Sequence, residues 1–172
     1  AAVSRSPAVY RGNPFQVEVA IAYGGQLMAD DLVRLIRFAN KVPLIYKQSA
    51  CAITKSVINT DWKNYGLQQS RGAIPSGPAM IVVHIASVWV PFTSESKEAI
   101  AHYPDIVKEI KLSLQDAGRK LASHIRKTVR VREQKEKAQL FEKYIPELAA
   151  GLASLSGSAK TNIEKDLNKI LK

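Results

Sequence analysis

The sequence lacks several features that define common classes of protein. It holds a single cysteine, Cys51, which excludes an internal disulfide and is typical of a reducing compartment. No stretch approaches the roughly 18 consecutive uncharged apolar residues of a membrane-spanning helix. The sequence does not begin with methionine, and it has no signal peptide with a basic start and an apolar centre. We therefore expect a cytoplasmic protein with no membrane partner, and a chain that is part of a longer polypeptide.

Patterns typical of metal sites and of catalysis are also missing. The three histidines (His84, His102 and His124) and Cys51 lack the spacing of metal ligands. The sequence contains no Walker-type glycine-rich phosphate loop and no nucleophile with a positioned base. His84 lies in an apolar run, where a histidine is more often a core residue with satisfied hydrogen bonds than a ligand. We expect neither a metal nor a catalytic residue in this chain.

Basic residues are in clear excess. The chain has 25 lysines and arginines against 15 acidic residues, a formal net charge of +10. Residues 119–137 alone hold eight basic residues and two glutamates, so more than half of the excess lies in one short stretch. Such a run is either the solvated face of a helix or a surface that neutralises nucleic-acid phosphates.

The hydrophobic pattern predicts a small sheet and a short helix. Residues 15–23 alternate between apolar and polar, which predicts a half-buried strand. Residues 79–90 are almost continuously apolar, as in a strand buried on both faces. Segment 32–46 fits a helix or a strand equally well on its own pattern. Ser49 is a suitable N-cap for a helix that places Ile53 and Val57 on one face.

A very long helix follows. It is predicted to begin near Pro104, a favourable first-turn residue, and its apolar residues keep a helical spacing from 106 to 125. Gly118 is its weak point, at a cost of about 1 kcal/mol relative to alanine. A helix over residues 104–140 would be roughly 55 Å long, so we expect its far half, which carries the basic run, to project from the domain.

The end of the chain is predicted to be a helical tail. Pro146 opens a short Ala/Leu-rich helical stretch, and residues 156–158 (Ser-Gly-Ser) indicate a flexible break. A last amphipathic helix has four apolar residues on one face: Ile163, Leu167, Ile170 and Leu171. Both pieces are too short to be stable alone, so they pack back on the domain or dock on a partner.

Residues 89–121 carry a resemblance to a known family. A buried strand runs into a polar loop, Phe92-Thr-Ser-Glu-Ser-Lys97, and the loop leads into the long helix. This arrangement resembles the transducer domain of the B subunit of DNA topoisomerase VI, a type IIB topoisomerase. The resemblance is strongest over residues 10–121 and thins after about residue 145.

The resemblance implies an α+β fold of the ribosomal S5 domain 2 type, a small β-sheet backed by helices with one very long projecting helix. Residues 1–145 would form the transducer domain. Its expected parts are a sheet at 8–92, a switch loop at 92–98 and a stalk helix at about 104–140, with a helical tail at 146–172. In this fold segment 32–46 is a strand.

The resemblance also implies site residues. In the GHKL ATPase superfamily, the transducer lysine contacts the terminal phosphate of ATP, and Lys97 holds that position. The sequence Trp62-Lys63-Asn64-Tyr65 matches a Trp-Lys-x-Tyr motif that is associated with DNA contact, although aromatic residues at this spacing also suit a partly buried position. The stalk residues expected to contact the DNA backbone are Arg119, Lys120, Arg126, Lys127 and Arg130.

The implied function is to couple ATP binding and hydrolysis in an adjoining ATPase domain to passage of a DNA duplex through the gate of the A subunit. ATP and Mg²⁺ would be bound mainly by an ATPase domain upstream, and none by this chain alone, which we expect to be inactive by itself. Expected partners are the topoisomerase VI A subunit, duplex DNA and, through ATP-dependent dimerisation of the ATPase domains, a second B subunit. The expected location is the archaeal nucleoid, or the nucleus of a eukaryote.

A second hypothesis is compatible with the same charge and length. The chain could be a free-standing nucleic-acid-binding protein of ribosomal S5-like fold with no ATP coupling. The feature that separates the two hypotheses is Ser96-Lys97-Glu98 directly before a long helix, because RNA binding alone does not require it.

Overall fold

The computed structural model describes residues 1–157 and 159–170. The chain divides into two compact units, Ala1–His124 and Ile125–Lys172. Helix α2 (Pro104–Ser156) contributes to both. None of the helices within the described residues combines the length and the apolar character needed to cross a membrane.

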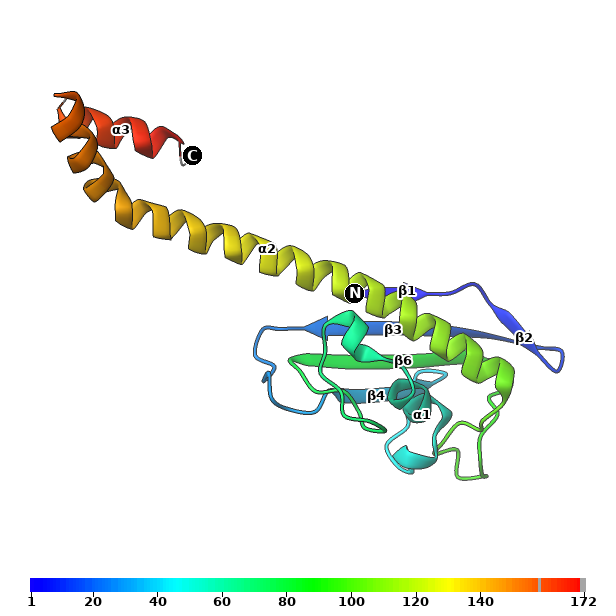
Figure 1. Ribbon diagram of the computed structural model, residues 1–172. Coiled ribbons are helices and arrows are strands. Elements are labelled where there is room, and N and C mark those ends of the chain that lie inside the picture. The colour runs from blue at the N-terminus through cyan, green and yellow to red at the C-terminus, as the bar shows by residue number, and fades with distance from the viewer. Residues whose placement is uncertain (158, 171–172) are drawn as a thin grey trace. The chain divides into compact units, whose positions relative to one another are not determined.

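The first unit is built on one mixed sheet (Figure 1). Its strands in the described part of the chain are β1 (Ala2–Ser4), β2 (Ala8–Tyr10), β3 (Asn13–Tyr23), β4 (Arg34–Ala39), β5 (Val42–Pro43) and β6 (Ala79–Ser87). They lie in the order β1-β3-β6-β4-β5, and β2 also pairs with β3. The two long central strands β3 and β6 are antiparallel, whereas β4 and β6 are parallel. The α+β prediction is confirmed.

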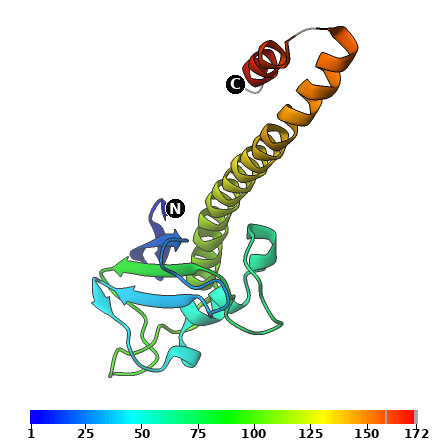
Figure 2. The same cartoon turned by 90° about the vertical axis from the view of Figure 1, so that its left-hand side faces the viewer.

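Helices cover one face of this sheet. Phe15, Val17, Val19 and Ile21 of β3 are buried, and the polar or small residues between them are not, so the predicted alternation is confirmed. Figure 2 shows α1 (Ala52–Ile58) and the first part of α2 on the same side of the sheet. The buried residues that α2 contributes to this core are Ile106, Ile110, Leu114, Ala117 and Leu121.

The other face of the sheet is open within the described residues. In β6, Met80, Val82 and His84 are half-buried, so the prediction of burial on both faces is wrong. His84 has the satisfied hydrogen bonds that we expected, but on the open face rather than in the core. Its ring contacts Glu18 at 2.9 Å and accepts the amide N–H of Lys41 at 3.1 Å.

Other local predictions differ from the structure. Segment 32–46 contains strands β4 and β5, as the family resemblance implied. Ser49 lies in a 3₁₀ turn, Gln48–Ala50, and the N-cap of α1 is Cys51, whose side chain makes no capping hydrogen bond. The backbone supplies a contact instead, because the amide of Ala52 donates to the carbonyl of Ile100 at 2.9 Å. Strand β1 lies outside the predicted sheet range of 8–92. It could not be predicted, because its three residues are too few to show an alternating pattern.

Helix α2 continues well past its predicted end near residue 140. Pro146 lies inside it and does not open a separate stretch. Most residues after Pro146 are alanine or leucine, which are good helix formers, and Ile145 and Ala149 are buried within the second unit. The helix ends before Gly157, whose φ of +70° suits a C-terminal cap, and α3 (Lys160–Ile170) follows. Ser158 and Leu171, which we assigned to the break and to the last apolar face, lie outside the described residues.

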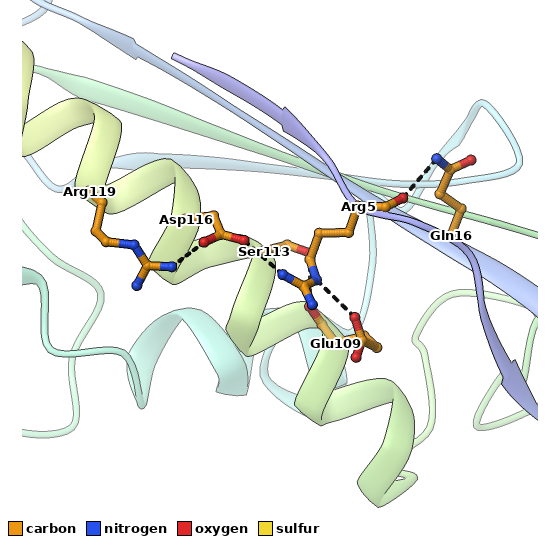
Figure 3. A network of polar contacts seen from close by, with 6 residues as sticks. All are labelled: Arg5, Gln16, Glu109, Ser113, Asp116 and Arg119. Carbon is orange, nitrogen blue, oxygen red and sulfur yellow. Dashed lines mark hydrogen bonds and ion pairs between the residues drawn. The ribbon is translucent and has the colours of Figure 1, made fainter.

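An arginine ties the first strands to α2 (Figure 3). Arg5, in the link between β1 and β2, donates from Nε to Glu109 at 2.9 Å and from Nη1 to Asp116 at 2.8 Å. Gln16 of β3 donates to the carbonyl of Arg5 at 2.9 Å, and Arg119 also pairs with Asp116. Burial raises the pKa of Asp116, but the hydrogen bonds from Arg5 and Arg119 outweigh it, and the net pKa is lowered.

We expect Arg5→Met to lower the free energy of unfolding near neutral pH by about 1 kcal/mol, because it leaves two partly buried carboxylates without their shared partner. A carboxyl with a lowered pKa stabilises the fold above its unfolded pKa of about 3.9 and loses that contribution as the pH falls through its folded pKa. Thermal unfolding of both proteins across this pH range should therefore show the difference shrinking in acid.

Arg132→Met is the matched control. Arg132 also pairs with a carboxylate, Glu136, but the two side chains are 80% and 59% exposed, against 32%, 19% and 28% for Arg5, Glu109 and Asp116. The control should have little effect on the melting temperature. Equal melting temperatures for Arg5→Met and the parent protein would contradict a stabilising role for Arg5.

Candidate switch loop and nucleic-acid interface

Lys97 lies at the tip of a short closed loop. Phe92 and Ile100 form a β-bridge at its base, and the amide of Thr93 donates to the carbonyl of Ala99 at 2.9 Å. The amide of Lys97 donates to the carbonyl of Ser94 at 3.1 Å, and its φ of +54° is in the left-handed region. The Lys97 side chain is exposed, and it forms no ion pair with any of the residues that the structure describes. The loop thus presents an exposed ammonium group to solvent.

A second lysine holds the loop on both sides of Lys97. Lys47 lies 2.8 Å from the Oε2 of Glu98 and donates to the hydroxyl of Ser96 at 3.3 Å. Ser96 in turn donates to Glu98 at 2.9 Å. The pKa of Glu98 is lowered, chiefly by the hydrogen bond from Lys47 and then by that from Ser96. Sequence reasoning missed Lys47, because no local pattern connects it with a loop that follows about fifty residues later.

The segment that carries Lys47 is fixed by a buried arginine of β4. Arg37 donates from Nη2 to the carbonyls of Leu44 at 2.8 Å and Tyr46 at 3.1 Å. Carbonyl oxygens oriented toward a buried cation offset part of its desolvation cost. Arg37 therefore fixes the backbone just before Lys47, and the side chain of Lys47 contacts the residues on either side of Lys97.

The predicted Trp-Lys-x-Tyr motif forms a 3₁₀ turn, η2 (Trp62–Tyr65). Asp61 caps it by accepting hydrogen bonds from the amide of Lys63 at 3.3 Å and the side chain of Asn64 at 2.9 Å. Trp62 is fully buried, and its Nε1 donates to the carbonyl of Val57 at 2.8 Å. Its indole belongs to the core and has no surface to offer DNA in this structure, as the alternative interpretation of the motif expected. Lys63 is exposed.

Tyr65 connects this turn to α2. Its ring meets the ring of Trp62 edge to face, with the centroids 6.0 Å apart. It also lies directly against the backbone of α2 at Gly118. The turn that carries Lys63 is therefore packed beside the start of the basic run, which begins at Arg119.

The basic residues of α2 fall in both units. In the first unit, Arg119 pairs with Asp116, and the ammonium of Lys120 donates to the carbonyl of Ala2 at 2.8 Å. Both also have exposed side chains, so they contribute to the fold and still face solvent. The predicted DNA-contact residues of the second unit are all exposed: Arg126, Lys127 and Arg130. A group of His, Cys, Asp or Glu side chains able to hold a metal ion does not occur within residues 1–157 and 159–170.

The matching family model and the sequence relatives of this chain agree on one family. Residues 1–137 match the family model described as the topoisomerase VI B subunit, transducer. The chain is 45% identical over 170 residues to the B subunit of type 2 DNA topoisomerase 6 from Methanococcoides burtonii, covering 99% of this chain and 26% of that protein. It is 40% identical over 171 residues to the protein of the same name from Pyrococcus horikoshii, covering 99% and 29%.

Among solved structures, the chain is similar to the B subunit of the DNA gyrase from Myxococcus xanthus. The identity is 21%, the TM-score is 0.43, and the match covers 70% of this chain and 34% of that one, a likeness too slight to argue from. The sequence relatives are far longer than this chain, which spans about a quarter of their length. On the family match and the sequence identity, the chain belongs to the topoisomerase VI B subunit transducer family.

Proposed function

We propose that this chain is the transducer part of an ATP-dependent type IIB DNA topoisomerase, and that it couples ATP binding and hydrolysis in an adjoining ATPase domain to double-strand passage. The match of residues 1–137 to the transducer family carries the proposal. The exposed ammonium of Lys97, at the tip of a closed loop that precedes α2, supplies the chemistry.

Lys97 would sense the terminal phosphate of ATP. An ammonium is a compact charge that binds phosphate strongly, and its contact disappears when the phosphate leaves. The base of the loop is bonded to the rest of the unit, since the carbonyl of Ile100 accepts the amide N–H of Ala52 at 2.9 Å and Ile100 is fully buried. A displacement of Lys97 would therefore be transmitted to the sheet and to the start of α2 together.

The DNA-contact residues would bind phosphates without reading sequence. The proposed set is Lys63, Arg119, Lys120, Arg126, Lys127 and Arg130, all exposed lysines and arginines. Trp62 is not in this set because its side chain is buried, and Tyr65 is not in it because its ring lies against the backbone of α2 at Gly118.

The remaining parts of the enzyme lie outside this chain. ATP and Mg²⁺ would be bound by the adjoining ATPase domain, and DNA cleavage would belong to the A subunit. A second B subunit would join through ATP-dependent dimerisation, and the assembly would act in the archaeal nucleoid or in a eukaryotic nucleus. The alternative, a free-standing nucleic-acid-binding protein without ATP coupling, is not favoured, because the matching family is that of a transducer.

The direct test is Lys97→Ala in the whole B subunit, in complex with the A subunit. Removing a charge-assisted contact that strengthens in the transition state should raise the barrier to ATP hydrolysis by about 2–4 kcal/mol, with a parallel loss of strand passage. Lys41→Ala is the matched control, since Lys41 is also an exposed lysine with positive φ but lies in another loop. A parental ATPase rate for Lys97→Ala would exclude the sensing role.

Lys47 should set the rigidity of the Lys97 loop. We expect Lys47→Met to reduce the hydrogen-exchange protection of the Lys97 amide about twofold to fivefold, the effect of losing a partly exposed ion pair. The pKa of Glu98 is lowered, and its ion pair with Lys47 requires the charged carboxylate. Acidifying the parent protein until Glu98 is protonated should therefore have the same effect on protection. Unchanged protection in both experiments would show that the loop is held by its backbone alone.

Charge reversal tests the DNA contacts of the second unit. Changing Arg126, Lys127 and Arg130 to glutamate should weaken duplex binding and make its salt dependence shallower, because each phosphate contact releases condensed counterions. Fluorescence anisotropy across a salt series would measure both, and circular dichroism would verify the fold. The control reverses three other exposed lysines, those of α3: Lys160, Lys165 and Lys169. Equal losses for the two triple variants would mean that only net charge matters.

A further inference from the structure

Gly118 lies in the interior of α2, where glycine is less favourable than alanine. It has no unusual backbone conformation that would require glycine. A Cβ at this position would lie 2.6 Å from Cδ2, 2.8 Å from Cγ and 2.9 Å from Cε2 of Tyr65, far inside van der Waals contact. The glycine is therefore needed for the ring of Tyr65 to lie on the helix backbone.

Gly151 shows that this constraint is specific to the first unit. It lies in the same helix, and a Cβ added there would have no other atom within 4 Å. Two glycines of one helix thus differ in their surroundings, since Gly118 is buried against an aromatic ring whereas Gly151 is exposed. This difference makes Gly151 a matched control for Gly118.

Tyr65 has little freedom to move away from Gly118. Its ring also meets Trp62, which is fully buried and bonded to the carbonyl of Val57. The turn ends at Gly66, which has a φ of +89°. Its amide N–H donates a hydrogen bond to the carbonyl of Lys63, and the chain reverses there. Lys63 therefore lies in a turn between two packed aromatic residues. Trp62 before it is buried in the core, and the ring of Tyr65 after it lies against Gly118.

We propose that Tyr65 is a positioning residue, not a DNA ligand. Its ring packs against Gly118 and so fixes the turn Trp62–Tyr65 to α2. Lys63 therefore keeps a fixed position relative to Arg119 and Lys120, which lie in α2 next to Gly118. The inference rests on the proposed function in one respect, the contact of Lys63 with a DNA phosphate. It adds that a duplex bound at Lys63 is held by the same compact unit as residues 104–124 of α2.

Thermal unfolding tests the packing without DNA. Gly151→Ala should raise the melting temperature by about 2–4 °C, the gain from helix propensity. Gly118→Ala has the same propensity gain but should lower the melting temperature, because the new methyl group displaces the Tyr65 ring. In a Tyr65→Ala background, where the ring is absent, Gly118→Ala should instead be stabilising. Equal effects of Gly118→Ala in both backgrounds would overturn the proposal.

Duplex binding then tests the consequence for Lys63. In the parent chain, Lys63→Ala should reduce the slope of log affinity against log salt by about one, the loss of one phosphate contact. In the Gly118→Ala background the same substitution should have a smaller effect, because Lys63 is already displaced. An equal effect in both backgrounds would overturn the positioning role.

Two further outcomes separate this inference from the proposed function. If Lys63→Ala changes nothing in the parent chain, the DNA contact of Lys63 is overturned, whereas the Tyr65–Gly118 packing is judged by the melting temperatures alone. Tyr65→Phe should retain both affinity and slope, since it keeps the ring. A loss as large as that of Tyr65→Ala would make the Tyr65 hydroxyl a DNA ligand and overturn its positioning role.

Discussion

The burial of the apolar face of α2 against the sheet is the interaction on which the rest of the first unit depends. Ile106, Ile110 and Leu114 are essentially fully buried, and they share one core with the inward residues of β3 and β6. Each buried aliphatic side chain contributes roughly 1.5–3 kcal/mol relative to exposure. The start of the helix cannot move separately from the sheet without losing several such contributions. Arg5 adds polar contacts to the same interface.

Two exposed lysines are attached to this body by different means. Lys97 lies at the tip of a loop held by the ion pair of Lys47 and Glu98, which is partly exposed and weak. Lys63 lies in a turn fixed by buried aromatic packing, which is strong. In the function that we propose, the phosphate-sensing group needs to move and the DNA-binding group needs to stay in place. The difference in attachment suits those two roles.

Local pattern predicted much of the architecture. The alternation of β3 and the start of α2 at Pro104 could both be predicted, because each depends on neighbours a few residues away in the chain. Segment 32–46 could not be assigned from its own pattern. Its apolar residues fit two periodicities, and pairing with β6 decides between them.

The sequence by itself determined the family, the helix and strand periods and the position of the basic run, because these are carried by residue order and spacing. Only the tertiary structure decided which residues could act. It buried Trp62, left one face of β6 open, placed Lys47 beside the Lys97 loop and placed the Tyr65 ring against Gly118. Each of these depends on contacts between segments far apart in the chain, and a local pattern carries no information about which distant side chain will occupy a given space.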